Sequence, residues 1–241
     1  MLDTFVRLDG RQRHQARPVT VEYGIVASAH GSVLFQLGAT KVLCTVIMQD
    51  GVPSFLRGKG TGWLTAEYTM LPGATYPRST RDSASCKRDG RAVEISRLIG
   101  RSLRAIVNLQ SIGERTIYVD CDVIQADGGT RTAAITSAYC ALRYAIDNKR
   151  FPNISYNAES LLRDSVGALA VGWSDGGPIL DMNYQEDSKV QADFNFVMTG
   201  SGKVIEIQGA AEQLPLEWPS IQSMQILAGD GISAMLKNLN Y

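Results

Sequence analysis

The chain has few of the side chains on which many hydrolytic enzymes depend. Only two histidines occur among its 241 residues, His14 near the start and His30 in a predicted turn. Neither belongs to a convincing Ser-His-Asp or Cys-His arrangement, and the surrounding sequence gives neither a role. The sequence therefore points away from chemistry that needs a histidine base.

Cysteines are equally few, and long apolar runs are lacking. The four cysteines are scattered without a C-x-x-C pair, so we expect free thiols in a reducing compartment: Cys44, Cys86, Cys121 and Cys140. No apolar run approaches the ~20 residues of a membrane helix, and the first residues lack a basic-then-apolar signal pattern. We therefore expect a cytoplasmic protein with no membrane partner.

A net charge is lacking as well, because 24 basic residues balance 24 acidic ones. This balance argues against a generally basic nucleic-acid binder. The charges are nevertheless uneven: residues 78–104 contain eight Lys or Arg against three acids, and residues 175–193 contain five acids against one Lys. A neutral chain of this kind can still place a focused anion site beside a carboxylate cluster.

Hydrophobic periodicity predicts strands and helices in blocks rather than in strict βαβ units. This order favours an α+β fold with mixed β-sheets packed against α-helices, and we expect one domain over residues 1–241. The expected strands cover residues 19–26, 33–37, 41–47, 63–71, 116–124, 166–173, 178–182, 192–198 and 204–208, and the expected helices cover residues 91–109, 132–146 and 218–239.

The most informative segment is the loop at residues 125–132, which joins an alternating strand to an apolar helix. Gly128 and Gly129 free the backbone, so successive N–H groups can face one concavity at the positive end of the helix. Arg131 adds a charged, planar fork of donors. The loop has neither a Walker lysine nor a Gly-x-Gly-x-x-Gly pattern. We interpret it as a site for a phosphate-sized anion; the alternative is a plain strand-to-helix turn with Thr130 as N-cap.

Arginines mark the helix predicted over residues 91–109. Arg97, Arg101 and Arg104 share one face at i, i+4 and i+7, a spacing more typical of salt bridges or a subunit contact than of catalysis. Arg91 stands at the start of the helix, and taken alone it is best interpreted as a solvated side chain.

Acids gather farther along the chain, at Asp181, Glu186, Asp187 and Asp193. Asp193 and Asn195 point to the same face of a strand that is otherwise rich in large apolar residues. A carboxylate in such a strand is costly unless it is used. Clustered carboxylates can hold Mg²⁺ or protonate a leaving oxygen, although an ordinary surface face fits the pattern equally well.

Five long motifs stand out. They are GATKVLCT at residues 38–45, GWLTAEYTMLP at 62–72, GRAVEISRLIGRSLRA at 90–105, DCDVIQADGGTRT at 120–132, and the acidic pair of residues 186–187 followed by DFN at 193–195. Together they resemble the ribonuclease PH family, from Asp9 nearly to the C-terminus. The resemblance implies the ribonuclease PH fold.

The same resemblance implies a phosphorolytic 3′-to-5′ exoribonuclease that trims tRNA precursors and other RNAs. Inorganic phosphate would attack the last phosphodiester and release a nucleoside 5′-diphosphate, and the reverse reaction would add nucleotides to RNA 3′ ends. Carried over residue by residue, phosphate binding falls on Arg91, Gly129, Thr130 and Arg131, and the catalytic or metal-binding role, with Mg²⁺ as the expected divalent ion, falls on Asp187 and Asp193.

RNA contacts are expected in the two longest connections, residues 51–62 and 72–88, because loops this long are often functional. Phosphate contacts carry most nucleic-acid affinity, and aromatic rings can stack on unpaired bases. The candidates are Phe55, Arg57, Arg78, Arg81, Lys87 and Arg88. The resemblance also implies a homohexameric ring, a trimer of dimers, which would bring the basic loops of a neutral chain together.

Two other functions are weighed against this one. A catalytically silent RNA-binding ring subunit would not need the charged site residues, yet all four are present: Arg91, Arg131, Asp187 and Asp193. A phosphorylase of free nucleosides would share the phosphate site but would also need an enclosed base pocket, for which the sequence shows no motif.

Overall fold

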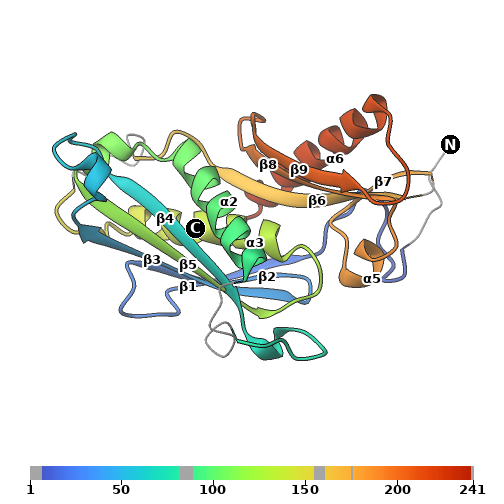
Figure 1. Ribbon diagram of the computed structural model, residues 1–241, viewed down its shortest axis with the longest axis horizontal. Helices are drawn as coiled ribbons and strands as arrows, with labels where there is room; N and C mark the ends of the chain where they lie inside the picture. Colours follow the sequence, from blue (N-terminus) through green and yellow to red (C-terminus); the bar gives the residue numbers. More distant parts are fainter. Residues whose placement is uncertain (1–6, 82–88, 155–160, 175, 240–241) are drawn as a thin grey trace.

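The computed structural model describes residues 7–81, 89–154, 161–174 and 176–239. These residues form two β-sheets and three long helices (Figure 1). The sheet orders are β1-β2-β3-β5-β4 and β7-β6-β8-β9. The first sheet and helix α2 form the left part of Figure 1, and the second sheet and α6 form the right part. The predicted α+β class with mixed sheets is confirmed.

The first sheet is antiparallel except for one parallel pair, β4 with β5. Its strands are β1 (Val19–Tyr23), β2 (Gly31–Leu37), β3 (Thr40–Asp50), β4 (Trp63–Met70) and β5 (Arg115–Gln125). The period-two pattern of β5 buries Ile117, Val119, Cys121 and Val123 on one face, as its sequence predicts. Because β4 and β5 run parallel, their last residues reach the same end of the sheet, where the glycine loop begins.

Helices α2 (Gly90–Ile106) and α3 (Thr130–Asp147) pack on the first sheet and on each other. Asp89 caps α2 by accepting hydrogen bonds from the N–H groups of Arg91 and Ala92, which is what an Asp at this position favours. Helix α3 also contacts strand β6 of the second sheet, and it is buried along nearly its whole length. This burial explains why its sequence is apolar on all sides rather than on one stripe.

The second sheet contains β6 (Val166–Ser174), β7 (Gly177–Leu180), β8 (Ala192–Thr199) and β9 (Val204–Ala211). Helix α6 (Trp218–Lys237) packs on β6, β7 and β8. The short helix α5 (Tyr184–Asp187) lies between β7 and β8 and was not predicted. A capping box between Asn183 and Glu186 supports it, a signal that is present in the sequence.

The largest departures from the predicted elements are at their ends. Three 3₁₀ turns occur in connections: η1 (Ser54–Leu56), η2 (Pro72–Ala74) and η3 (Leu109–Ile112). Helix α3 begins at Thr130, two residues before the predicted start, and its N-cap is Gly129 with φ +64°. Thr130 is therefore not the cap. Within the described part of the chain, no helix is both long and apolar enough to cross a membrane.

Candidate active site

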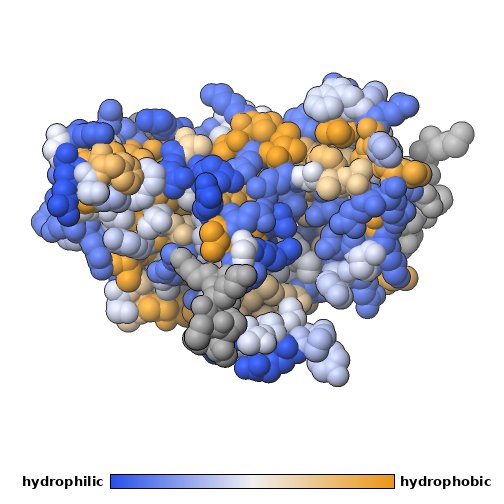
Figure 2. Space-filling view, viewed as in Figure 1, coloured by the Kyte–Doolittle hydropathy of each residue, from blue (hydrophilic) through white to orange (hydrophobic). Residues whose placement is uncertain are grey.

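A cavity of about 760 Å³ lies between the two sheets. Its walls come from the end of β4, the loop that follows β5, the first residues of α2 and α3, helix α5, and strands β6 and β8. Figure 2 shows hydrophilic side chains gathered in the middle of the molecule, where its two parts meet. Every residue that we assigned to phosphate binding or catalysis lines this cavity: Arg91, Gly129, Thr130, Arg131, Asp187 and Asp193.

The glycine loop turns sharply into α3. Gly128 and Gly129 both have φ in the left-handed region, +75° and +64°. A Cβ on Gly128 would lie 2.7 Å from the carbonyl oxygen of Met182, so a side chain does not fit there. The first N–H groups of α3 have no partner within the helix, and they open toward an anion together with the helix dipole. The loop has the build of a phosphate site.

The two arginines enter the cavity from different elements. Arg131 sits in the first turn of α3, where its Nη1 donates to Oε1 of Gln208 at 3.2 Å and lies 3.8 Å from Oε1 of Glu94. Arg91 sits in the first turn of α2. The ion pair with Glu94 is long and only one hydrogen bond is made, so the guanidinium of Arg131 retains donors for a bound anion. The structure thus places Arg91 in the same cavity as Arg131, which its sequence context alone did not indicate.

Asp193 lies on β8 with most of its surface buried, and burial, then the nearby charge of Asp187, raises its pKa to about 6. Its Oδ1 is buried and has no hydrogen-bond partner among the described residues, while Asn195 donates to Oδ2 at 3.4 Å. A buried carboxylate oxygen without a partner is costly in a folded protein. It is satisfied once a proton or a cation is present.

Asp187 ends helix α5 and lines the same cavity as Asp193. Burial and the charge of Glu212 raise its pKa, against the opposite effects of Arg91, Arg131 and Arg17. Among the described residues, no group of three or more His, Cys, Asp or Glu forms a closed metal cage. Two carboxylates without such a cage suit Mg²⁺, which keeps water and substrate phosphate as its other ligands.

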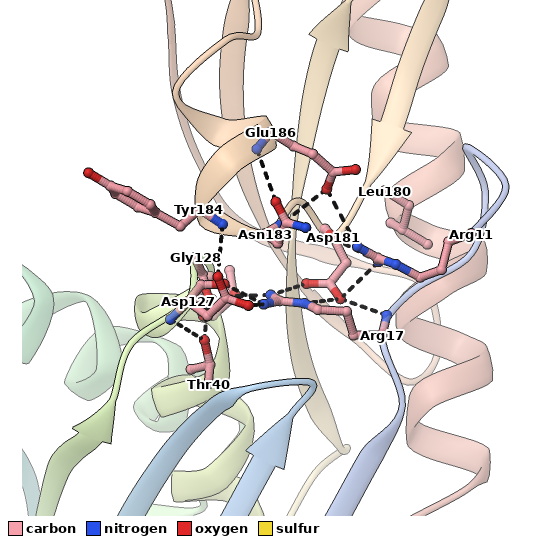
Figure 3. A network of polar contacts seen from close by, with 12 residues as sticks. Arg11, Arg17, Thr40, Asp127, Gly128, Leu180, Asp181, Asn183, Tyr184 and Glu186 are labelled. Carbon is pink, nitrogen blue, oxygen red and sulfur yellow. Dashed lines mark hydrogen bonds and ion pairs between the residues drawn. The ribbon is translucent and has the colours of Figure 1, made fainter. Parts of the chain in front are cut away.

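The remaining acids of the segment have another task. Asp181 is fully buried and accepts hydrogen bonds from the backbone N, Nε and Nη2 of Arg17 at 2.8, 2.9 and 2.7 Å (Figure 3). Glu186 pairs with Arg7 at 2.5 Å and with Arg11 at 3.4 Å. These ion pairs lower the pKa of Glu186, although burial alone would raise it. Asp181 and Glu186 are therefore structural acids, not members of the site.

Sequence reasoning did not find the arginines that hold these acids. Arg7, Arg11 and Arg17 lie in the N-terminal segment, about 170 residues before their partners, and no local pattern connects the two segments. The sequence did contain one signal, the density of arginine in this short stretch: Arg7, Arg11, Arg13 and Arg17 fall within eleven residues.

Two family models match the chain. The model described as the 3′ exoribonuclease family, domain 1, matches residues 15–146, and domain 2 of that family matches residues 164–223. The chain belongs to the 3′ exoribonuclease family. The ribonuclease PH resemblance is thereby confirmed, and the cavity lies where residues of the two matched regions meet. Our expectation of one domain over residues 1–241 stays a prediction.

Solved structures share the fold of this exoribonuclease-family chain. An Archaeoglobus fulgidus exosome with RNA bound to the active site matches with a TM-score of 0.81 and 19% identity, covering 98% of this chain and 93% of that one. Rice (Oryza sativa) Rrp46 matches with a TM-score of 0.75 and 21% identity, covering 96% and 99%. An archaeal exosome core matches with a TM-score of 0.76 and 19% identity, covering 95% and 89%.

The RNA candidates of this family member fall in three places. Arg78 and Arg81 are exposed in the segment after η2, close in sequence to Thr75 and Tyr76, which line the cavity. In Figure 1 this teal segment projects below the body of the molecule. Lys87 and Arg88 lie outside the described residues.

Phe55 and Arg57 are far from the cavity within one chain. Phe55 packs edge-on against Trp63 at 5.5 Å between ring centroids, at the start of β4. The cavity is at the other end of that strand, about 25 Å away for eight extended residues. A contact between these two residues and an RNA bound in the same chain's cavity would need a long substrate, so their role stays a prediction.

The regularly spaced arginines of α2 have mainly structural partners. Arg101 donates to both carboxylate oxygens of Glu206, at 2.9 and 2.6 Å. Arg104 donates to the carbonyl oxygen of Leu64 at 2.9 Å and stacks on the ring of Trp63 at 4.6 Å. The prediction of a structural role is confirmed for these two, which tie α2 to both sheets.

Proposed function

We propose that the protein is a ribonuclease PH-type phosphorolytic 3′-to-5′ exoribonuclease. Inorganic phosphate is the co-substrate, and the products are a nucleoside 5′-diphosphate and an RNA one residue shorter. The observation that carries the proposal is one cavity with two features. It has a positively charged site that can bind an anion, and it has a pair of carboxylates with raised pKa values. The anion site suits the attacking phosphate, and the carboxylates suit the oxygen that leaves the RNA.

The nucleophile needs no base, because inorganic phosphate is already an anion at neutral pH. The obstacle is the repulsion between it and the RNA phosphate. Arg91, Arg131 and the N–H groups at the start of α3 offset that repulsion and orient the attacking oxygen. This explains how the site works without a histidine in its walls.

The leaving group is the 3′-oxygen of the next nucleotide. As the attacking phosphate oxygen bonds to the terminal phosphorus, the bond from phosphorus to that 3′-oxygen breaks, and the oxygen needs positive charge. Asp187 and Asp193 can hold that positive charge near the leaving oxygen, because burial and the repulsion of neighbouring carboxylates favour a bound proton or cation. A divalent ion such as Mg²⁺, held by these two carboxylates, would supply electrostatic stabilisation of the leaving oxygen.

The substrate is RNA with a free 3′ end, and we include tRNA precursors among the substrates. Arg78 and Arg81 stand along the chain next to the cavity wall, where they can contact the RNA backbone. We further propose a cytoplasmic homohexameric ring, a trimer of dimers. Ring assembly would concentrate the basic segments of a chain whose own net charge is zero.

The alternative of a silent RNA-binding subunit is disfavoured by one observation: the phosphate loop and the two acids Asp187 and Asp193 line the same cavity. The deciding assay incubates purified protein with a short RNA, Mg²⁺ and phosphate. We expect nucleoside 5′-diphosphates that appear only with phosphate, and RNA lengthening when nucleoside diphosphates are supplied instead. A protein that binds RNA but releases no diphosphate would be a silent subunit, and cleavage of free nucleosides would indicate a nucleoside phosphorylase.

Arg131→Ala tests the anion site directly. Because one preorganised donor to a developing charge is worth about 10²–10³ in rate, we expect kcat/KM for phosphate to fall by about that factor while the thermal unfolding midpoint stays near wild type. Arg143→Ala, on the exposed face of the same helix, is the matched control. Near wild-type phosphate-dependent turnover in Arg131→Ala would rule out this assignment.

A further inference from the structure

The phosphate loop is held in place by side chains that do not line the cavity. Arg17 Nη1 donates to the carbonyl oxygen of Asp127, and Nη2 donates to that of Gly128 at 3.3 Å. Thr40 Oγ1 donates to the same Gly128 oxygen at 2.7 Å and accepts from the N–H of Asp127 at 2.9 Å. Two consecutive loop carbonyls are therefore drawn toward Arg17 and Thr40 (Figure 3).

These hydrogen bonds to the carbonyls set the direction in which the loop's backbone N–H groups point. In a trans peptide the N–H points opposite to the C=O of the same unit. The carbonyls of Asp127 and Gly128 share their peptide units with the N–H groups of Gly128 and Gly129. Because these carbonyls face Arg17 and Thr40, the two N–H groups point away from them, and both glycines line the cavity.

Arg17 is itself fixed by a fully buried acid. Asp181 is 0% exposed and receives three hydrogen bonds from Arg17, one from the backbone and two from the guanidinium. Its backbone is left-handed at φ +48°, a conformation that a residue other than glycine keeps only where its surroundings impose it. A buried ion pair is also a poor source of net stability compared with apolar packing. A fixed guanidinium is what this pair provides.

The pair also joins the two sides of the site. Arg17 precedes β1, whereas Asp181 follows β7 and leads into the helix that ends at Asp187. The loop packs directly on the pair, because a Cβ on Gly129 would lie 3.0 Å from Arg17 Nη2 and 3.6 Å from Asp181 Oδ1. The phosphate loop and the acid-bearing segment are thus positioned by one shared contact.

We infer that Arg17, locked by Asp181 and assisted by Thr40, is the positioning residue that turns the phosphate loop's N–H groups toward bound phosphate. The inference rests on the proposed function for the identity of the anion. Arg17 acts through the loop backbone and not on the reacting atoms. Its loss should therefore weaken the use of phosphate and leave RNA binding nearly unchanged.

Thr40→Val and Thr40→Ser form the cleanest pair of variants, since valine matches threonine in shape and removes only the hydroxyl, while serine retains it. We expect Thr40→Val to raise KM for phosphate by ~10-fold and Thr40→Ser to restore it to within ~2-fold, because a loop misplaced by an ångström can cost ~10² in rate. KM for RNA should change by less than ~2-fold in both.

Arg17→Lys and Arg17→Met test the contribution of the Arg17 guanidinium itself. Lysine keeps the charge, but its donors are all on one nitrogen and cannot span Asp181 and two carbonyls together. We therefore expect kcat/KM for phosphate to fall ~10-fold, and ~10²-fold for methionine. Arg115→Met is the matched control, because Arg115 also pairs with an acid and a carbonyl but stands at the opposite end of β5. It should keep the wild-type KM for phosphate.

A second readout is the rise in unfolding temperature that inorganic phosphate alone produces, without RNA. We expect this rise in wild type, Thr40→Ser and Arg115→Met, and its reduction in Thr40→Val and Arg17→Lys. If folded Thr40→Val and Arg17→Lys keep the wild-type KM and protection, Arg17 and Thr40 have no positioning role. If Arg17→Met does not fold, the lysine and threonine variants decide. Wild-type protein that is protected by phosphate but releases no diphosphate would overturn the proposed function and leave the inference standing.

Discussion

Two pairs of acids lie within thirteen residues of each other and have opposite surroundings. Asp181 and Glu186 are saturated by Arg17, Arg7 and Arg11. Asp187 and Asp193 are without such pairing, and burial raises the pKa of both. In the first pair the acid's charge is compensated within the protein, and in the second it is left for a ligand to compensate. This difference separates the structural acids from the acids that we propose to be catalytic.

The arginines differ in the same way. The guanidinium of Arg17 has all its main directions filled by Asp181 and two loop carbonyls. That of Arg131 has one hydrogen bond, to Gln208, and one long ion pair. A guanidinium whose N–H groups are all hydrogen-bonded within the protein stabilises the fold, whereas one with unused N–H groups can bind substrate. Three substitutions test the comparison between the acids.

Asp187→Asn should have the largest effect. Loss of a group that handles the proton or cation at the leaving oxygen typically costs about 10²–10⁴ in rate, so we expect kcat for phosphorolysis to fall in that range. RNA affinity by gel shift and oligomer size by light scattering should stay at wild-type values. Asp147→Asn, at the far end of α3, is the matched control. Loss of RNA binding at normal oligomer size would place Asp187 in RNA binding instead.

Asp181→Asn should be the most damaging to stability. It leaves the buried guanidinium of Arg17 without its counter-charge, which typically costs about 3–5 kcal/mol in free energy of unfolding. Chemical denaturation measures this quantity. Asp50→Asn is the control: its carboxylate is 85% exposed and pairs with Arg115 at 3.1 Å, so we expect a change of less than about 1 kcal/mol. Equal effects for the two variants would remove the distinction between the two classes of acid.

Asp193→Asn should change the stability less than Asp181→Asn does, and in the opposite direction. With a folded pKa of about 6 against an ordinary value of 3.8, the folded protein binds more protons than the unfolded chain between those pH values. The free energy of unfolding therefore falls as pH rises from about 4 to about 6. Asparagine removes the charge, so we expect this variant to gain about 1–3 kcal/mol at pH 8 while losing phosphorolysis.

The measurement is denaturation at a series of pH values without phosphate or divalent ions. Below pH 4 wild type and Asp193→Asn should have nearly equal stability, since Asp193 is then protonated in both the folded and unfolded states. A variant less stable than wild type at pH 8 would show that the Asp193 carboxylate is satisfied in the folded protein, which would move it to the structural class.

Much of the fold followed from local patterns. The alternation in β5 and the apolar periodicity of α3 identified both elements, and only their ends were off by one or two residues. Helix α5 was missed because four residues are too few for a period to register, although its Asn183–Glu186 capping box is visible in the sequence. The loop at residues 128–131 was recognised because glycines and an arginine at a helix start have a direct physical use.

The sequence by itself determined the side chains available to this protein: an anion loop with Arg131, an acid-rich segment and no convincing histidine base. Only the tertiary structure decided which acids are free. Asp181 and Asp193 look alike in the sequence, and their difference comes from arginines that fold back from the N-terminal segment onto one and not the other. A carboxylate's pKa depends on which charges and dipoles lie within a few ångströms, and those neighbours are set by the fold and not by the adjacent sequence.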